Sequence, residues 1–141
     1  MMVTQIACGN SHTVCLTSDY EMYTWGQSSG GGRSNVIPTL VDLSDIAVPP
    51  VVVSKVACGY WSTTAVLNTG RVYEWELGCP IKPVSNGLDA ESVRSVSCGG
   101  FHTICITDSA LVYSWGKNSC FQLARPDVTD FSNIAQPVNI I

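Results

Sequence analysis

Charged residues are scarce in this chain. They make up 13% of its 141 residues, whereas a typical soluble domain has about 25%. The seven basic residues stand singly and are outnumbered by eleven acidic ones, which gives a net charge of −4. A nucleic-acid-binding surface needs clustered Lys and Arg side chains, so we predict no nucleic-acid partner. The hydrophobic content of 45% also excludes a disordered chain.

Long apolar runs are missing as well. No segment approaches the ~18 residues that cross a bilayer, and Met1–Cys15 lacks the basic and apolar regions of a secretory signal. We therefore predict no membrane association. The seven cysteines cannot all pair, because their number is odd. They indicate reduced, buried packing residues in an intracellular compartment, cytoplasmic or nuclear.

No stretch of the sequence shows sustained helical periodicity, but the chain does repeat itself. Each of the three units contains a cysteine that is followed by a tryptophan 17 residues later. The segments after each tryptophan differ in length. We place the units at residues 3–50, 53–90 and 93–141. The framework residues are Cys8, Cys58 and Cys98 with Trp25, Trp75 and Trp115.

Short runs rich in β-branched and aromatic residues predict strands within each unit. In the second unit these are Val53–Cys58, Thr63–Leu67 and Val72–Glu76, with a hairpin turn at Asn68–Gly70. A fourth strand beside a proline suits an edge position. Units of this length with four antiparallel strands are typical of propeller blades. We predict an all-β fold, a partial β-propeller of about three blades. The turns equivalent to Asn68–Gly70 are Ser18–Tyr20 and Asp108–Ala110, and the fourth strands are Thr39–Leu43, Ile81–Val84 and Gln136–Ile140.

The pattern I-A-C-G-x-x-H-T-x-x-L-T…Y-x-W-G resembles the repeat of the regulator of chromosome condensation (RCC1) family. The second unit departs from it, with Ser62 in place of His and Glu76 in place of Gly. The G-Q-L-G segment of the family survives only as Phe121–Ala124, with the letters FQLA. The matching residues are Cys8, Gly9, His12, Thr13, Tyr23, Trp25 and Gly26 in the first unit, Cys58, Gly59, Thr63, Gly70, Tyr73 and Trp75 in the second, and Cys98, Gly99, His102, Thr103, Tyr113, Trp115 and Gly116 in the third.

The resemblance implies closed rings of seven blades, whereas this chain has three units. An open arc would expose two apolar blade faces, more than a monomer normally tolerates. We therefore expect a fragment whose missing blades complete the ring, a chain that closes with another copy, or a piece of a large assembly. A truncated form, short isoform or partial gene model is the favoured explanation.

Two patterns resemble ligand sites. Cys8, His12 and Cys15, echoed by Cys98, His102 and Cys105, carry zinc-type ligands. We favour a structural role, because the second unit has Ser62 and Ala65 at two of these positions and alternate strand residues face opposite ways. The histidines are expected to bond backbone groups between strands. The glycine-rich segment Ser28–Ser34 lacks the Lys and helix of a phosphate-binding loop and is predicted to be a flexible loop.

Nothing in the sequence indicates an enzyme. Neither histidine has an independently supported nucleophile beside it. Glu74 and Glu76 are interpreted as a solvated strand face rather than a glycosidase or calcium site. We predict no catalytic residue, no metal and no cofactor.

Aromatic loop residues indicate a contact surface instead. Tyr60 and Trp61 lie between two predicted strands, where an exposed tryptophan suits an interface. The equivalent loops contain Asn10 with Ser11, and Phe101. These five residues are the candidate interface. Relatives of this repeat include plant ultraviolet photoreceptors, but their G-W-R-H-T pattern is GYWST here, so light sensing is discounted.

We thus expect a non-catalytic protein–protein interaction module with an unidentified protein partner. One alternative, which the resemblance permits, is a guanine-nucleotide exchange factor for a small GTPase, although no unit contains the hairpin insertion that such activity uses in the founding family member. Another is a regulatory or localisation domain of a larger ubiquitin ligase or kinase.

Overall fold

The computed structural model describes residues 1–28, 34–46, 50–85 and 87–140. These residues form strands and no helix, as the sequence predicted. The strands make three separate four-stranded antiparallel sheets, each from one repeat unit. Sequential strands pair within each sheet, which is the connectivity of a propeller blade. We call the sheets blade 1, blade 2 and blade 3.

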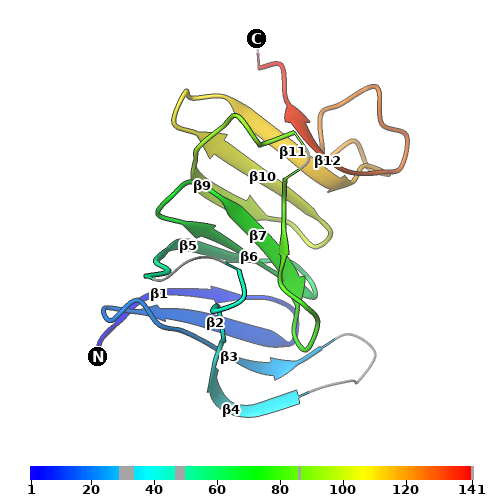
Figure 1. The fold of residues 1–141 in the computed structure, drawn as a ribbon. Coiled ribbons are helices and arrows are strands. Elements are labelled where there is room, and N and C mark those ends of the chain that lie inside the picture. Colours follow the sequence, from blue (N-terminus) through cyan, green and yellow to red (C-terminus); the bar gives the residue numbers. More distant parts are fainter. Residues whose placement is uncertain (29–33, 47–49, 86, 141) are drawn as a thin grey trace.

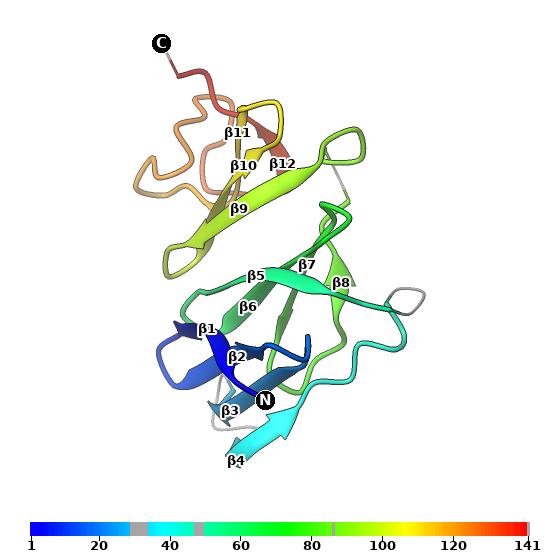
Figure 2. The same cartoon turned by 90° about the vertical axis from the view of Figure 1, so that its left-hand side faces the viewer.

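Blade 1 contains β1 (Val3–Cys8), β2 (His12–Thr17), β3 (Met22–Gln27) and β4 (Ser34–Leu40). Blade 2 contains β5 (Val53–Cys58), β6 (Ser62–Leu67), β7 (Val72–Glu76) and β8 (Lys82–Pro83). Blade 3 contains β9 (Val93–Cys98), β10 (His102–Thr107), β11 (Val112–Lys117) and β12 (Phe131–Pro137). The blades stack in chain order, with the two termini at opposite ends of the stack (Figures 1 and 2).

The hairpin turns formed as predicted. Backbone N–H groups of Tyr20, Gly70 and Ala110 donate back to the end of the preceding strand. All three residues have positive φ, between 64° and 81°. The unit with glycine at this position therefore has the residue that the turn favours, whereas the other two units place a side chain there.

The outer strands were predicted too far along the chain in blades 1 and 3. β4 and β12 begin earlier than expected because the pairing register shifts at Gly26 and Gly116, which have φ of +106° and +107°. The irregularity lets pairing resume directly opposite the end of the third strand, at Gln27 with Ser34. Residues after β4, including Leu43, instead pack against the core.

The hydrophobic core lies between blades. Val14, Leu16 and Met22 of blade 1 pack in one cluster with Tyr73 and Trp75 of blade 2. The next interface repeats this plan, with Val66 and Val72 against Tyr113 and Trp115. The tryptophan and tyrosine at these positions are thus core residues where a preceding blade covers them, as the sequence predicted. In blade 1, Tyr23 and Trp25 are only half-buried.

The cysteines are free thiols, but they are not uniformly buried. Cys15 and Cys105 are buried, whereas Cys8, Cys79 and Cys120 are exposed. Desolvation raises the pKa of Cys58 and of Cys105 to about 12. Cys8 differs from its equivalents, the half-buried Cys58 and Cys98, because no preceding blade covers β1. The expectation that the cysteines within apolar runs are buried packing residues is therefore wrong for Cys8.

Candidate functional site

The loops that join the first two strands of each blade lie next to one another along one side of the stack. The Asn10 N–H donates to the Tyr60 carbonyl at 3.1 Å, and the Tyr60 N–H donates to the Gly100 carbonyl at 2.7 Å. These bonds link three blades through their backbones. Loops held in this way present their side chains from a fixed framework.

Three aromatic side chains gather on these loops. The Tyr60 ring stacks on Phe101 at a centroid distance of 5.3 Å and meets Trp61 edge-on at 4.8 Å. Tyr60 is 39% exposed and Phe101 is 54% exposed. The Lys117 ammonium lies 5.7 Å from the Phe101 centroid, within cation–π distance. We call Tyr60, Trp61 and Phe101 the aromatic loop cluster.

The other two candidate residues lie beside this cluster. Asn10 is exposed, Ser11 is half-buried, and the Asn10 side-chain amide donates to the Ser11 hydroxyl at 3.0 Å. The fold therefore brings together all five residues that the sequence singled out. Their proximity follows from the stacking of the blades, which places equivalent loops side by side.

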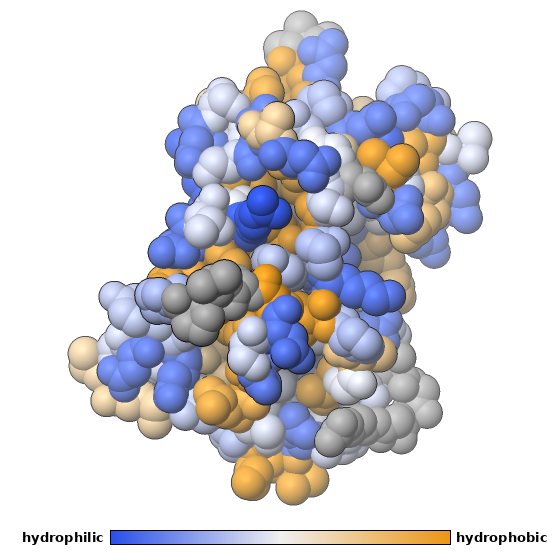
Figure 3. All heavy atoms as spheres, viewed as in Figure 1, coloured by the Kyte–Doolittle hydropathy of each residue, from blue (hydrophilic) through white to orange (hydrophobic). Residues whose placement is uncertain are grey.

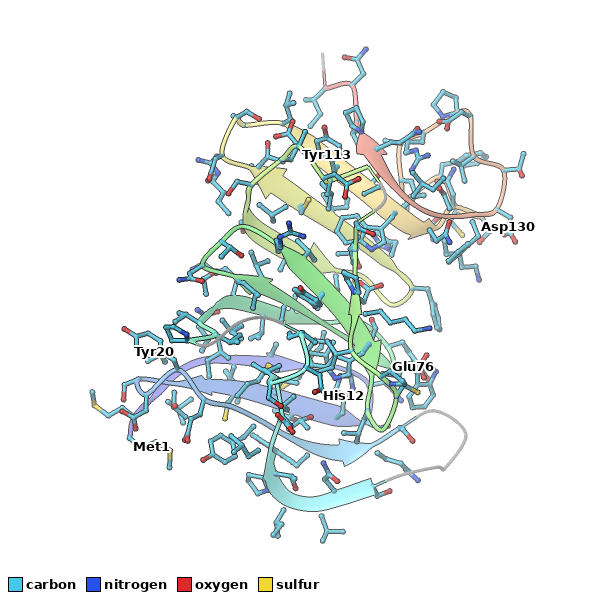
Figure 4. The ribbon with its side chains drawn as sticks, viewed as in Figure 1. Met1, His12, Tyr20, Glu76, Tyr113 and Asp130 are labelled. Atoms are coloured by element: carbon cyan, nitrogen blue, oxygen red, sulfur yellow. The ribbon has the colours of Figure 1, made fainter. Side chains whose placement is uncertain are left out.

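The histidine of blade 1 has a structural role. His12 Nε2 lies 3.2 Å from the Ser62 carbonyl oxygen and 3.1 Å from Thr63 Oγ1 in blade 2. Its ring lies over Gly9, where any Cβ would collide with it. Figure 4 shows His12 near Glu76. Burial lowers the pKa of His12, against the raising effects of the Ser62 bond and the Glu76 charge.

The equivalent histidine in blade 3 behaves differently. Within the described part of the chain, the His102 ring makes no hydrogen bond, because no further blade packs on that side of blade 3. The expected backbone bond is therefore confirmed for His12 and wrong for His102. No cluster of three or more metal-binding side chains occurs among the described residues. The predicted loop Ser28–Ser34 lies outside the described residues over 29–33.

A cleft of about 400 Å³ separates blades 2 and 3 next to the aromatic loop cluster. Its wall includes Glu74, Glu76 and Trp115 together with Trp61 and Phe101. Glu74 is half-buried, and its Oε2 accepts hydrogen bonds from two threonine hydroxyls. The sequence interpretation as a solvated strand face was therefore wrong for Glu74. The two donors are Thr64 at 2.7 Å and Thr103 at 3.0 Å.

A buried arginine in the loop before β12 also escaped the sequence analysis. Arg125 is 6% exposed, and its guanidinium donates to the carbonyls of Ser114 and Ile134 and to the Gln136 side chain. It forms an ion pair with Asp127 at 3.3 Å. Arg125 thus fastens the loop to β11 and β12. Its proximity to the FQLA remnant was the only sequence signal for this role.

Comparison with known proteins agrees with the geometry. A model of the regulator of chromosome condensation (RCC1) repeat matches residues 3–31 and 93–122. The chain is built of RCC1-like repeats. Both matched segments belong to units that keep the His-Thr pair, and blade 2 is the unit with Ser62 in place of the histidine.

Two curated relatives illustrate the range of proteins that carry such repeats. Ras guanine nucleotide exchange factor C of Dictyostelium discoideum is 30% identical over 98% of this chain and 11% of its own length. The human E3 ubiquitin-protein ligase HERC2 is 31% identical over 87% of this chain and 3% of its own. This RCC1-like chain therefore corresponds to a small part of each relative.

The fold is shared with solved RCC1 structures. Yeast RCC1 (Prp20), in its complex with Kap60, superposes with a TM-score of 0.80 at 17% identity. The match covers 98% of this chain and 37% of the yeast chain. The three sheets are therefore blades of an RCC1-type β-propeller. No helix in the described ranges is long and apolar enough to cross a membrane.

Proposed function

We propose that this RCC1-like chain is a non-catalytic protein-interaction module, and that the aromatic loop cluster is its contact surface. The observation that carries the proposal is the stacked, exposed pair of Tyr60 and Phe101 on loops bonded to one another. Exposed aromatic side chains on a rigid framework bury large areas at low entropic cost when a partner binds. Asn10 and Ser11 supply polar groups beside them.

The partner proposed is another protein. The acidic net charge of −4 disfavours nucleic acid, whose binding depends on cationic contacts with phosphates. The free cysteines favour an intracellular location, cytoplasmic or nuclear.

The test compares proteins captured by three forms of the chain. The double variant Tyr60→Ser/Phe101→Ser removes the stacked pair, while Phe121→Ser removes an aromatic side chain that is 84% exposed elsewhere. We expect a specific set of proteins to bind the wild type and the Phe121 variant and to be lost from the double variant. Equal capture by all three forms would overturn the proposal.

Guanine-nucleotide exchange is the second candidate, because one relative carries that name and matches 98% of this chain. The match covers 11% of that protein, so the repeats are a small part of it. We expect the 141-residue chain at micromolar concentration to leave the release of fluorescent GDP from Ras-type GTPases unchanged. Accelerated release would favour exchange activity over a binding-only role. A regulatory or localisation domain within a larger ligase or kinase is compatible with the first proposal.

A further inference from the structure

The cleft between blades 2 and 3 exists because blade 2 departs from the repeat at matched positions. Between blades 1 and 2, the His12 imidazole fills the space against Thr63. At the next interface the equivalent residue is Ser62, whose short side chain leaves that space open. Gly59 is the equivalent of Gly9, whose missing side chain leaves room for the His12 ring. Blade 2 therefore keeps the glycine that an imidazole requires, although Ser62 stands in place of the histidine.

Two carboxylates occupy positions that are neutral in the other blades. Glu76 replaces a glycine and lies directly opposite Ser62 in the β6–β7 register. Glu74 stands where blades 1 and 3 have Thr24 and Ser114, and it lies opposite Thr64. The same unit thus loses a bulky side chain and gains two negative charges along one cleft. Lys82, an exposed residue of β8, is a positive charge in the same wall.

The remaining wall is aromatic. Trp115, which is 4% exposed, is one of the residues that line the cleft. Trp61 and Phe101 line the cleft at the side of the aromatic loop cluster.

We infer that this cleft takes an arginine side chain from a partner protein, an inference that rests on the proposed interaction function. A guanidinium fits the wall because its donors pair with carboxylates while its flat face stacks on aromatic rings. An arginine side chain can use both the carboxylates and the aromatic rings of the wall, whereas a simple cation pairs only with the carboxylates.

The binding test uses the peptide acetyl-Ala-Arg-Ala-amide, with the citrulline peptide as its uncharged counterpart. The NMR signals of the Trp61 and Trp115 indole N–H groups report on the cleft of the 141-residue chain. We expect saturable shifts with a dissociation constant of about 1 mM, as suits a single anchoring side chain, and no saturation with the citrulline peptide. Equal responses to the two peptides would overturn the inference.

Three variants locate the binding. Glu74→Gln and Glu76→Gln each remove a charge and should weaken binding at least ~5-fold, since charge-assisted bonds are the strong ones. Asp19→Asn makes the same change of net charge at an exposed turn residue of blade 1, next to Tyr20 and well away from Glu76 (Figure 4), and should have no effect. In Glu74→Gln the amide oxygen can still accept the threonine hydrogen bonds, so loss of folding is not expected, and dispersed amide spectra verify it.

Ser62→His restores the side chain that the repeat has in blades 1 and 3. The imidazole should fill the cleft and abolish saturation while the protein stays folded. Persistent peptide binding in Ser62→His would overturn the inference. If this variant instead loses the peptide yet captures the same proteins as the wild type, the aromatic loop cluster stands as the interface and the inference that the partner's arginine uses the cleft is wrong.

Discussion

Equivalent residues in the three blades meet different surroundings, and their physical roles differ accordingly. The third turn residue is glycine in blade 2 only, although Tyr20 and Ala110 adopt the same left-handed conformation. Gly70 also lies against the next blade, where an added Cβ would be 2.8 Å from Ser92 Cα. Gly70 is therefore required for two reasons, whereas Ala110 is tolerated despite its conformation.

A matched pair of substitutions separates these effects. Gly70→Ala should destabilise the fold by more than the ~1–2 kcal/mol of left-handed strain, because the steric conflict with Ser92 adds to it. Ala110→Gly removes such strain but increases the conformational freedom of the unfolded chain. Because the two effects partly cancel, we expect the free energy of unfolding to rise by at most ~1 kcal/mol. Urea unfolding measures both free energies. A loss of stability in Ala110→Gly would contradict the strain argument.

At the scale of elements, the strands were predictable because the Cys-to-Trp spacing and β-branched runs are local features. β5 and β7 agree with the prediction at both ends, and β7 lies between two tight turns. The outer strands were misplaced because their pairing depends on the irregularity at Gly26 and Gly116 and on loops of unequal length. The cleft could not be found from local patterns, because it forms between side chains of two blades. Its signal was the coincidence of Ser62, Glu74 and Glu76 in one unit.

The stacking of blades predicts that replacing the repeated tryptophans by alanine lowers the free energy of unfolding by unequal amounts. Trp75 is 9% exposed and lies in the core between blades 1 and 2, so Trp75→Ala should cost about 3–5 kcal/mol. Trp25 has no preceding blade over it and is half-buried, so Trp25→Ala should cost at least ~1 kcal/mol less. Denaturant titration of both variants provides the comparison. Equal losses of unfolding free energy in the two variants would mean that burial between blades does not determine how much each tryptophan stabilises the fold.

At the scale of the whole molecule, each end of the stack exposes a blade face of the kind that a neighbouring blade covers inside the stack. Val3 is 63% exposed, whereas its equivalents Val53 and Val93 are 5% and 4% exposed beneath a preceding blade. Ile6 is likewise 65% exposed, and Figure 3 shows apolar surface at the lower end of the molecule, over blade 1. The opposite face, on blade 3, leaves Ile104, Ile106 and Val112 half-buried.

These faces have complementary groups. Blade 3 offers the His102 ring, unpaired within the described residues, and the Gly100 N–H. Blade 1 offers the carbonyls of Asn10 and His12, which are equivalent to the groups that pair inside the stack. We therefore expect the isolated 141-residue chain to self-associate as its concentration rises, because exposed apolar faces of this kind are unfavourable in water. Light scattering on a sizing column measures the molar mass.

Ile6→Arg places a charge on the blade 1 end face and should shift the chain towards monomer at a given concentration. Leu111→Arg is the matched control, because Leu111 is an exposed apolar turn residue whose equivalent in blade 2 is Arg71. It should leave the association unchanged. A monomeric wild type at every concentration, or equal effects of the two substitutions, would show that the end faces do not drive association. In that case the arc is stable without a covering blade, and the interfaces inside the stack must supply nearly all of its folding free energy.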